Sequence, residues 1–380
     1  MKPIITISRF LVGTLFIFSG LVKANDPLGL AYKMQEFFEV WAQSGWFPGL
    51  MNTLSHYALT FSIVMITLEI VAGVAVLIAW RMGFFSWLLL VLIIFFTFLT
   101  GYADLSGKFR SCGCFGDCIP LTPRASFIKD LVLLALIVLI FSQRNKIKHN
   151  ISSYGGFTVV GLSAVMTLWL QWYVLKHLPL ADCLPFKKGN NIPENMRIPA
   201  GAIPDSTVIS FVYEKAGATV EFTSDNFPDD FDDSLYHFVK RYDKLIRKGN
   251  AEPAIKDFVL TTLSGNDTTS AVLNTPGSSA FLFVKDDPGK GLWIKDIQSL
   301  YALLKQKGIP LFVITNNHEG IAPYFRSLPD AIFLKCDVVP IKTAARANPT
   351  LYLLNEGTIL NKWSYADWTR AEKDIQIIVN

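Results

Sequence analysis

Long apolar stretches alternate with short polar joins along the first half of the chain. Five of these stretches reach the length of about 20 residues that crosses a bilayer core. They carry few charges and comprise Ile4–Val22, Tyr57–Ala79, Met82–Gly101, Ala125–Ser142 and the stretch from Gly155 to Leu175. The pattern predicts an α-helical transmembrane bundle of four helices followed by a fifth span.

The joins between the spans differ in length, and this difference predicts how the helices are arranged. Trp80–Arg81 and Gln143–Asn150 are short, so the spans on either side of each join are expected to be hairpin neighbours. The loops Lys23–Ser55 and Tyr102–Arg124 are longer. In the first of these, aromatic residues recur at helical spacing beside charged ones, which predicts an amphipathic helix that caps the bundle at the membrane interface.

The chain after the fifth span has the composition of a soluble protein and begins with a proline-rich connector. Val208–Tyr213 and Thr219–Thr223 then alternate apolar and polar positions and predict a hairpin. The acidic run Asp229–Asp233 is interpreted as the start of a helix over Leu235–Arg247 rather than as a calcium site.

Strand and helix patterns alternate from Lys256 to the C-terminus. Asp257–Thr269 predicts a strand, a tight turn and a second strand. Further strands are expected at Phe281–Val284, Leu311–Thr315, Asn348–Leu354 and Gly357–Trp363, with helices over Asp296–Lys307 and His318–Leu328. This order resembles the soluble α/β thioredoxin-like domain of the TlpA kind, in which the position matched by Pro349 is a cis proline.

The resemblance fails at the point that matters most for chemistry. A thioredoxin-like domain carries Cys-x-x-Cys after the strand that corresponds to Phe281–Val284, but Lys285–Leu292 contains no cysteine. We therefore expect this domain to dock a partner and not to exchange disulfides itself. The expected division of the chain is a four-helix membrane module (1–145), a fifth helix (146–180), a membrane-proximal α+β connector (181–255) and the thioredoxin-like domain (256–380).

Composition supports a membrane protein and argues against nucleic-acid binding. Hydrophobic residues make up 51% of the 380 residues and charged residues 17%, which is too apolar for an ordinary soluble enzyme. The net charge of +4 is small and spread along the chain, so no nucleic-acid partner is expected. The first apolar stretch has full spanning length and no small-residue cleavage site, so we do not expect a cleavable signal peptide.

Five spans place both long loops and everything after Leu175 on one side of the membrane, whichever way the chain inserts. Basic residues are denser in the short joins on the opposite side. The expected orientation is therefore an N-terminus in the bacterial cytoplasm and a C-terminal domain in the periplasm, across the inner membrane. All the cysteines then face an oxidising compartment in which disulfides form.

Three of the five cysteines, Cys112, Cys114 and Cys118, lie within seven positions of one another. Gly113 and Gly116 in the same run allow the tight turns that bring the sulfurs close. Such a cluster between two spans points to disulfide exchange or to a metal. A bond between Cys112 and Cys114 would be strained, and strained disulfides exchange readily.

Cys183 lies eight residues beyond Leu175, which limits its distance from the membrane surface to about 28 Å. We expect its Cα atom to lie within about 7 Å of that of Cys112, Cys114 or Cys118. Sequence does not choose among the pairings. Redox-active cysteines, two inert disulfides, and a zinc site completed by Cys183 or His177 remain the alternatives, and Cys336 is expected to stay apart as a buried thiol.

Glu69 is the one carboxylate well inside a predicted span. Burying a charged carboxylate in the membrane is costly, so Glu69 is expected to be protonated or paired. Lys23 at the outer mouth of the first span and the Lys129–Asp130 end of the fourth are the candidate partners. Its role is either proton acceptor in a bundle pocket, next to a quinone, or polar clamp between helices.

Three short motifs carry a second resemblance, which covers residues 1–145. They are Phe18-Ser19-Gly20-Leu21-x-Lys23 with Asp26-Pro27, Leu68-Glu69-x-x-x-Gly73, and Cys112-Gly113-Cys114-Phe115-Gly116. Together they resemble the MauE/DoxX family of four-helix membrane proteins. That resemblance implies a redox process outside the inner membrane, and MauE members are linked to the maturation of disulfide-rich partners.

Two functions are consistent with these observations. In the first, Cys112, Cys114, Cys118, Cys183 and Glu69 form a site that exchanges disulfides with a periplasmic or envelope protein, with a quinone as a further electron carrier and lipid around the helices. In the second, the cysteines are structural disulfides and the outer domain is a non-catalytic scaffold. The sequence leaves the oligomeric state open.

Overall fold

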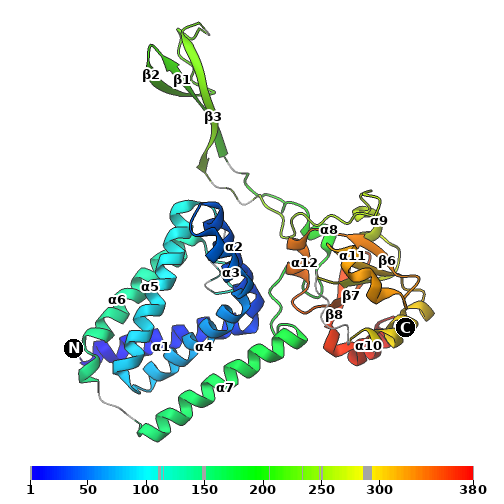
Figure 1. The fold of residues 1–380 in the computed structure, drawn as a ribbon, viewed down its shortest axis with the longest axis horizontal. Coiled ribbons are helices and arrows are strands. Elements are labelled where there is room, and N and C mark those ends of the chain that lie inside the picture. The colour runs from blue at the N-terminus through cyan, green and yellow to red at the C-terminus, as the bar shows by residue number, and fades with distance from the viewer. Residues whose placement is uncertain are drawn as a thin grey trace.

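The structure is a computed structural model. It describes residues 2–109, 113, 115–147, 151–204, 206–232, 234–247, 249, 251–285 and 293–379. Figure 1 shows a helical N-terminal part, a small sheet that projects away from it, and a compact C-terminal domain.

Five helices among the described residues are long and apolar enough to cross a membrane. Their positions agree with the five predicted spans. They are α1 (Lys2–Asn25), α4 (Ala58–Leu77), α5 (Met82–Ser106), α6 (Pro123–Ser142) and α7 (Ser153–His177). Helices suit this environment because all their interior backbone hydrogen bonds are made within one segment.

Close packing and a few polar contacts hold these helices together. α1 packs on α4, α5 on α6, and α7 along α4 and α1 (Figure 1). Gly13 and Gly73 let α1 and α4 approach so closely that a Cβ on Gly73 would lie 2.9 Å from the carbonyl oxygen of Gly13. Arg9 donates from its guanidinium to the carbonyls of Val76 and Leu77 at the end of α4.

The first long loop is a pair of helices, α2 (Pro27–Gln43) and α3 (Pro48–His56). Asp26 caps α2 by accepting a hydrogen bond from the backbone N–H of Gly29, with Pro27 at the first helical position. The buried face of α2 packs over α4 and against α5. The predicted amphipathic helix over the bundle is therefore present.

A three-stranded sheet in the order β2-β1-β3 stands apart from the rest of the molecule (Figure 1). Its strands are β1 (Ser206–Lys215), β2 (Ala218–Thr223) and β3 (Tyr236–Arg247). Ala216 and Gly217 both have positive φ in the β1–β2 turn, as a two-residue hairpin requires. The predicted hairpin is confirmed.

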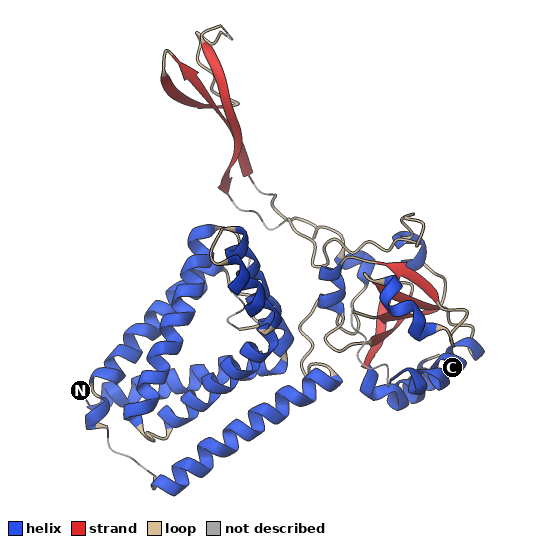
Figure 2. Cartoon of the chain, in the orientation of Figure 1, coloured by secondary structure: helices blue, strands red, loops and turns tan. Residues whose placement is uncertain are grey.

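The helix predicted over Leu235–Arg247 is wrong, because this segment is strand β3 and pairs antiparallel with β1 (Figure 2). The strand places Tyr236 in a cluster of aromatic rings with Tyr213, Phe222 and Phe231. From the acidic run, Asp230 pairs with Lys215 and accepts a hydrogen bond from Tyr236 instead of capping a helix. Cross-strand aromatic packing thus outweighs the helical charge pattern.

The C-terminal domain is built on a five-stranded sheet in the order β6-β5-β4-β7-β8. β4, β5 and β6 are parallel to one another, β7 is antiparallel to β4, and β8 is antiparallel to β7. The strands are β4 (Ser278–Phe283), β5 (Leu311–Thr315), β6 (Ile332–Lys335), β7 (Thr350–Asn355) and β8 (Thr358–Ser364).

Helices cover both faces of this sheet, because alternate strand residues point to opposite sides. Ala280 and Leu282 pack toward α10 (Trp293–Gln306) and α13 (Trp368–Ile378). Phe281 and Phe283 face the other side, which is covered by α8 (Ile192–Asn195), α9 (Thr269–Leu273) and α12 (Val338–Ala344). Phe186 and Ile192, which follow α7 closely in sequence, are buried in this second core.

The predicted strands that build this sheet are confirmed, and so is the cis peptide bond Asn348–Pro349. The segment over His318–Leu328 folds as two short turns of helix, α11 (His318–Ile321) and η2 (Ala322–Phe325). The strand, turn and strand expected over Asp257–Thr269 is wrong, because this segment forms only isolated bridges, from Thr261 to Asp267 and to Lys335. β6, α12 and α13 were not predicted.

Candidate functional site

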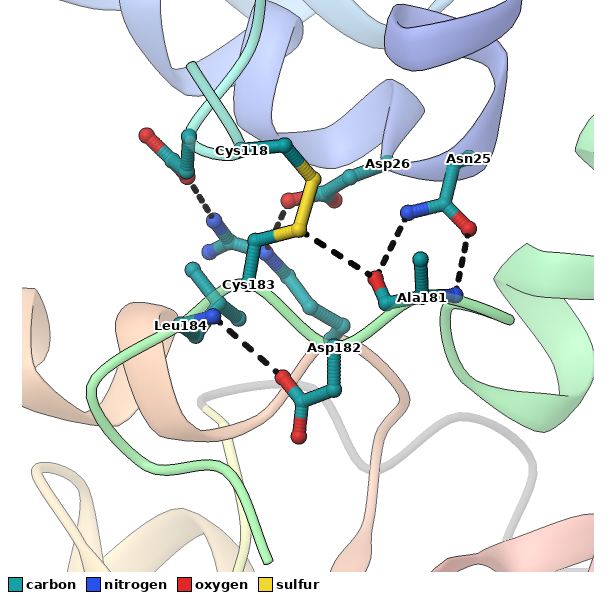
Figure 3. Close-up of a disulfide and its surroundings, with 9 residues drawn as sticks. Asn25, Asp26, Cys118, Ala181, Asp182, Cys183 and Leu184 are labelled. Atoms are coloured by element: carbon teal, nitrogen blue, oxygen red, sulfur yellow. Dashed lines mark hydrogen bonds and ion pairs between the residues drawn. A yellow bond between two sulfur atoms is a disulfide. The ribbon is translucent and has the colours of Figure 1, made fainter. Parts of the chain in front are cut away.

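A disulfide joins the membrane helices to the C-terminal domain. Cys118, in the loop between α5 and α6, is bonded to Cys183, in the segment that follows α7 (Figure 3). Their sulfurs are 1.94 Å apart and their Cα atoms 4.8 Å apart. The prediction that Cys183 reaches the cysteine loop is therefore confirmed. Cys112 and Cys114 lie outside the described residues.

The segment that carries Cys183 is tied to the end of α1 by a pair of hydrogen bonds (Figure 3). The side-chain amide of Asn25 donates to the carbonyl of Ala181 at 2.8 Å, and the N–H of Ala181 donates back to Asn25 Oδ1 at 2.9 Å. Because these hydrogen bonds lie next to the disulfide, they fix the segment that carries Cys183 against the end of α1.

A buried guanidinium lies next to this disulfide and bridges two parts of the membrane module. Arg346, in the loop between α12 and β7, donates from Nε to Asp26 at 2.7 Å and from Nη2 to Asp117 at 2.9 Å. Asp117 immediately precedes Cys118 in the chain. Burial acts to lower the pKa of Arg346, but the carboxylates of Asp26 and Asp117 outweigh it and raise that pKa, so Arg346 is charged.

Tyr32 on α2 contacts three basic side chains of the C-terminal domain. The ammonium of Lys285 donates to the Tyr32 hydroxyl at 3.0 Å. The charged ends of Lys285, Lys342 and Arg346 lie 5.7, 5.2 and 5.4 Å from the centre of its ring, within the range of cation–π attraction. Burial, followed by the charges of Arg346 and Lys342, lowers the pKa of Lys285 to about 7, whereas burial raises that of Tyr32 to about 12.

Lys285 lies two residues beyond the end of β4, where thioredoxin-like domains carry the cysteines that this chain lacks. Its backbone N–H donates to the side chain of Asn348, next to cis-Pro349, at 2.9 Å. The end of β4 and the proline loop therefore form one continuous surface, and this surface lies against α2.

Glu69 on α4 is buried in an ion pair with Lys23 on α1. Lys23 Nζ lies 2.9 and 2.7 Å from the two carboxylate oxygens, and both side chains are almost completely excluded from solvent. The predicted pairing of Glu69 with Lys23 is confirmed. The other candidate, Lys129–Asp130, forms a pair of its own at 2.7 Å, and Asp130 also accepts from Thr100.

Two small cavities lie on either side of Lys23, beneath the cysteine loop. One, of about 20 Å³, is lined by Glu69, Asp130 and the loop residue Phe115. The other, of similar size, is bordered by the loop residue Gly113. Each has room for about one water molecule. Lys23, Glu69 and Asp130 give the first cavity polar walls, whereas the second is lined mostly by apolar side chains.

The remaining cysteine, Cys336, is a buried free thiol in the core of the C-terminal domain, as predicted. Burial raises its pKa to about 12, so it is not a nucleophile at neutral pH. His177, the alternative zinc ligand, is hydrogen bonded to Asp367 at 2.9 Å. Within the described ranges, no group of three or more His, Cys, Asp or Glu side chains is arranged to hold a metal.

Sequence reasoning missed Arg346 and did not connect Lys285 or Asp117 with the site. No local signal could have found Arg346, because 320 residues separate it from Asp26. The sequence did contain a weak indication of the role of Asp117, because a partly buried carboxylate beside a candidate redox cysteine needs a charged or hydrogen-bonding partner.

Comparisons with known proteins agree with the two parts of the structure. Residues 1–143 match the family model described as methylamine utilisation protein MauE, and residues 207–248, which include most of β1–β3, match a domain of unknown function, DUF8463. Over 170 residues the chain is 27% identical to Protein TlpB of Flavobacterium psychrophilum, covering 43% of this chain and 42% of that protein. The chain thus spans less than half the length of this curated relative.

A crystal structure of a thio-disulfide isomerase from Thermus thermophilus is also similar, with 20% identity and a TM-score of 0.26, covering 33% of this chain and 94% of that one. The strand order, the mixture of parallel and antiparallel neighbours and the cis proline before β7 independently match the thioredoxin-like pattern. The chain therefore joins a MauE-like membrane module to a C-terminal thioredoxin-like domain.

Proposed function

We propose that this protein takes part in thiol–disulfide exchange with a periplasmic or envelope protein, at the outer face of the bacterial inner membrane. The observation that carries the proposal is the Cys118–Cys183 disulfide. It connects the cysteine loop of the membrane module to the first segment of the outer domain, and two further cysteines, Cys112 and Cys114, share that loop.

The exchange proceeds by thiolate attack on the disulfide. A thiolate of the partner attacks one sulfur of Cys118–Cys183, forms a mixed disulfide and releases the other cysteine as a thiolate, which takes up a proton. The partner's second thiol then resolves the mixed disulfide. Two electrons pass from the partner dithiol to Cys118 and Cys183, and the partner leaves oxidised. Where Cys112 and Cys114 are joined as a disulfide, the Cys118 thiolate attacks that bond, and the Cys183 thiolate then attacks Cys118, so that Cys118–Cys183 re-forms and Cys112 and Cys114 are released as reduced thiols.

Glu69 is proposed to accept a proton beneath this loop. The cavity between Glu69, Asp130 and Phe115 has room for about one water molecule, which links carboxylates to the loop above. A quinone remains a candidate acceptor of the electrons from the loop, but a quinone ring would need a larger space than either cavity beside Lys23 offers. The geometry therefore favours a proton-transferring role for Glu69.

Thiol trapping in native membranes tests the proposal. Free thiols are alkylated, disulfides are reduced, and the released thiols are labelled with a mass tag across a series of redox poises. We expect Cys118 and Cys183 to change from bonded to free together, while Cys336 stays free throughout. Cys112→Ser or Cys114→Ser removes the next electron acceptor and is expected to make reduced Cys118 and Cys183 accumulate. A Cys118–Cys183 bond that resists every poise excludes the catalytic function.

A non-catalytic scaffold is the second candidate. It is favoured by Lys285, which stands where a thioredoxin-like domain carries its cysteines and instead contacts Tyr32. In this case the disulfide is a static tie. Full function of the triple variant Cys112→Ser, Cys114→Ser, Cys118→Ser at normal protein levels would support the scaffold, with Cys336→Ala as the matched control for loss of a cysteine.

A further inference from the structure

The contacts between the membrane module and the thioredoxin-like domain are polar. No buried hydrophobic cluster of the described residues contains side chains from both parts, because two clusters lie wholly in the outer domain and four in the membrane helices. The interface therefore lacks the apolar core that makes domain contacts permanent, and it resembles contacts that open and close.

Charge complementarity supplies the attraction in place of apolar burial. The outer domain contributes the cations Lys342 and Arg346 to one small face, and Lys285 beside them donates a hydrogen bond to the Tyr32 hydroxyl. The membrane module opposes the cations with the carboxylates of Asp26 and Asp117, and the Tyr32 ring contacts all three basic side chains. Gln35 accepts a longer hydrogen bond from Lys342 at 3.5 Å.

One covalent bond reinforces this face. Cys118 neighbours Asp117, so the disulfide and the Arg346–Asp117 pair fasten the same stretch of the cysteine loop to the outer domain. The chain enters the domain from α7 at Leu178, whose φ of 100° is strained for a residue with a side chain, followed by Pro179. This turn links α7 to the domain, and because His177 at the end of α7 contacts Asp367 of the domain at 2.9 Å, movement at the turn also breaks that contact.

We propose that the thioredoxin-like domain is a removable cap on the cysteine loop, docked through Lys285, Lys342 and Arg346 onto the α2 of its own membrane module. The Cys118–Cys183 disulfide keeps the cap closed. After the disulfide is reduced, only the polar contacts hold the domain. The cap then opens and exposes both the loop and the cationic face. The docking rests on geometry alone, whereas its control by reduction rests on the proposed function.

Hydrogen exchange of the full chain in lipid nanodiscs tests the cap. The informative peptides cover α2 (27–43) and the segment 338–349, and peptides from β4 and β5 report whether the domain stays folded. In the oxidised wild-type protein, we expect α2 and 338–349 to be protected. Cys183→Ser removes the covalent tie, Arg346→Gln removes the charged one, and the double variant removes both.

Each single variant is expected to lose part of the protection. The double variant is expected to exchange at least about tenfold faster in α2 and 338–349, because it loses a charge-assisted contact and a covalent tether together. β4 and β5 should be unchanged. Arg346→Lys in the Cys183→Ser background should restore part of the protection. Lys305→Gln, which breaks an exposed pair with Asp330 elsewhere on the domain, is the matched control.

Two outcomes would overturn the proposal. One is protection of α2 and 338–349 in the double variant equal to that of the wild type, which would mean that the domain is fixed by other contacts. The other is a lack of protection of these segments in the oxidised wild-type protein. Neither outcome affects the thiol-trapping test, so failure of the cap and failure of the proposed exchange reaction are distinguishable.

Discussion

Two buried ion networks differ in what they connect. Lys23 and Glu69 pair within the membrane module, between α1 and α4. Arg346 pairs with Asp26 and Asp117 across the boundary between that module and the thioredoxin-like domain. The first network forms whenever the bundle forms, whereas the second exists only while the outer domain is docked. The Lys23–Glu69 pair therefore stabilises the membrane module itself, whereas the Arg346 pairs stabilise its contact with the thioredoxin-like domain.

The largest effect is expected from breaking the internal pair. Glu69→Leu or Lys23→Met leaves its partner charged and buried, and we expect each to lower the free energy of unfolding by about 3–5 kcal/mol. The double variant removes both charges and should recover most of the loss. Unfolding of the purified protein in detergent measures the cycle. Single variants as stable as the wild type would show that the pair does not hold the bundle together.

The disulfide at the boundary should contribute less. Cys118→Ser or Cys183→Ser is expected to lower stability by about 2 kcal/mol, at the low end for a cross-link, because the spans already restrain the loop. Melting of the outer domain, followed by its tryptophan fluorescence, reports the change. Addition of reductant to the wild-type protein serves as the control. Reduction should reproduce the effect of the serine variants.

The two carboxylates around Arg346 are expected to be unequal. The side chain of Asp26 is 14% exposed and that of Asp117 49%. Asp26→Asn should therefore weaken the docked state by about 2 kcal/mol, and Asp117→Asn by less than about 1 kcal/mol, since exposed pairs are screened by solvent. Melting of both variants in the Cys183→Ser background compares them. Equal effects of the two variants would mean that the buried pair with Asp26 does not stabilise docking more than the exposed pair with Asp117.

The smallest effect concerns pH. Lys285 faces Tyr32, Lys342, Arg346 and Asp26, and burial followed by the positive neighbours lowers its pKa to about 7 in the docked state. A free lysine has a pKa of about 10.4, so the undocked domain binds more protons between these values. Docking should strengthen as pH rises from about 7 to about 10, by up to about tenfold per pH unit, and be weakest below pH 7.

Hydrogen exchange of α2 in the Cys183→Ser background, corrected for the intrinsic effect of pH on amide exchange, measures this dependence. Lys285→Met should abolish it over the same range, whereas Lys305→Gln should leave it unchanged. A dependence of opposite sign would mean that Lys285 remains charged in the docked state.

Local patterns were enough to predict much of the fold. The five spans follow from uncharged apolar runs, because a helix that crosses lipid must satisfy its backbone within one segment. Four of the five strands of the C-terminal sheet follow from apolar runs bounded by turns, and the Lys23–Glu69 pair follows from the cost of a carboxylate inside a span. Each of these depends on residues that are close in sequence or confined to one layer of the membrane.

Other features depended on partners far away in the chain. The segment Tyr236–Arg247 mixes charged, aromatic and aliphatic residues, so its periodicity allows a helix. Only pairing with β1 and the aromatic rings of Tyr213 and Phe222 makes it a strand. The short helix α12 was likewise missed, because tertiary packing stabilises such an element more than its own propensity does.

For this protein, the sequence by itself determined the five apolar spans, four of the five strands of the C-terminal sheet, the absence of cysteines after β4 and the nearness of Cys183 to the cysteine loop. Only the tertiary structure decided that Cys118 is the partner of Cys183, and that Lys285, Lys342 and Arg346 meet Tyr32 and two aspartates on the membrane module. The physical reason is that charges find partners through space and not along the chain, and the contacts of Arg346 cross 229 and 320 residues of sequence.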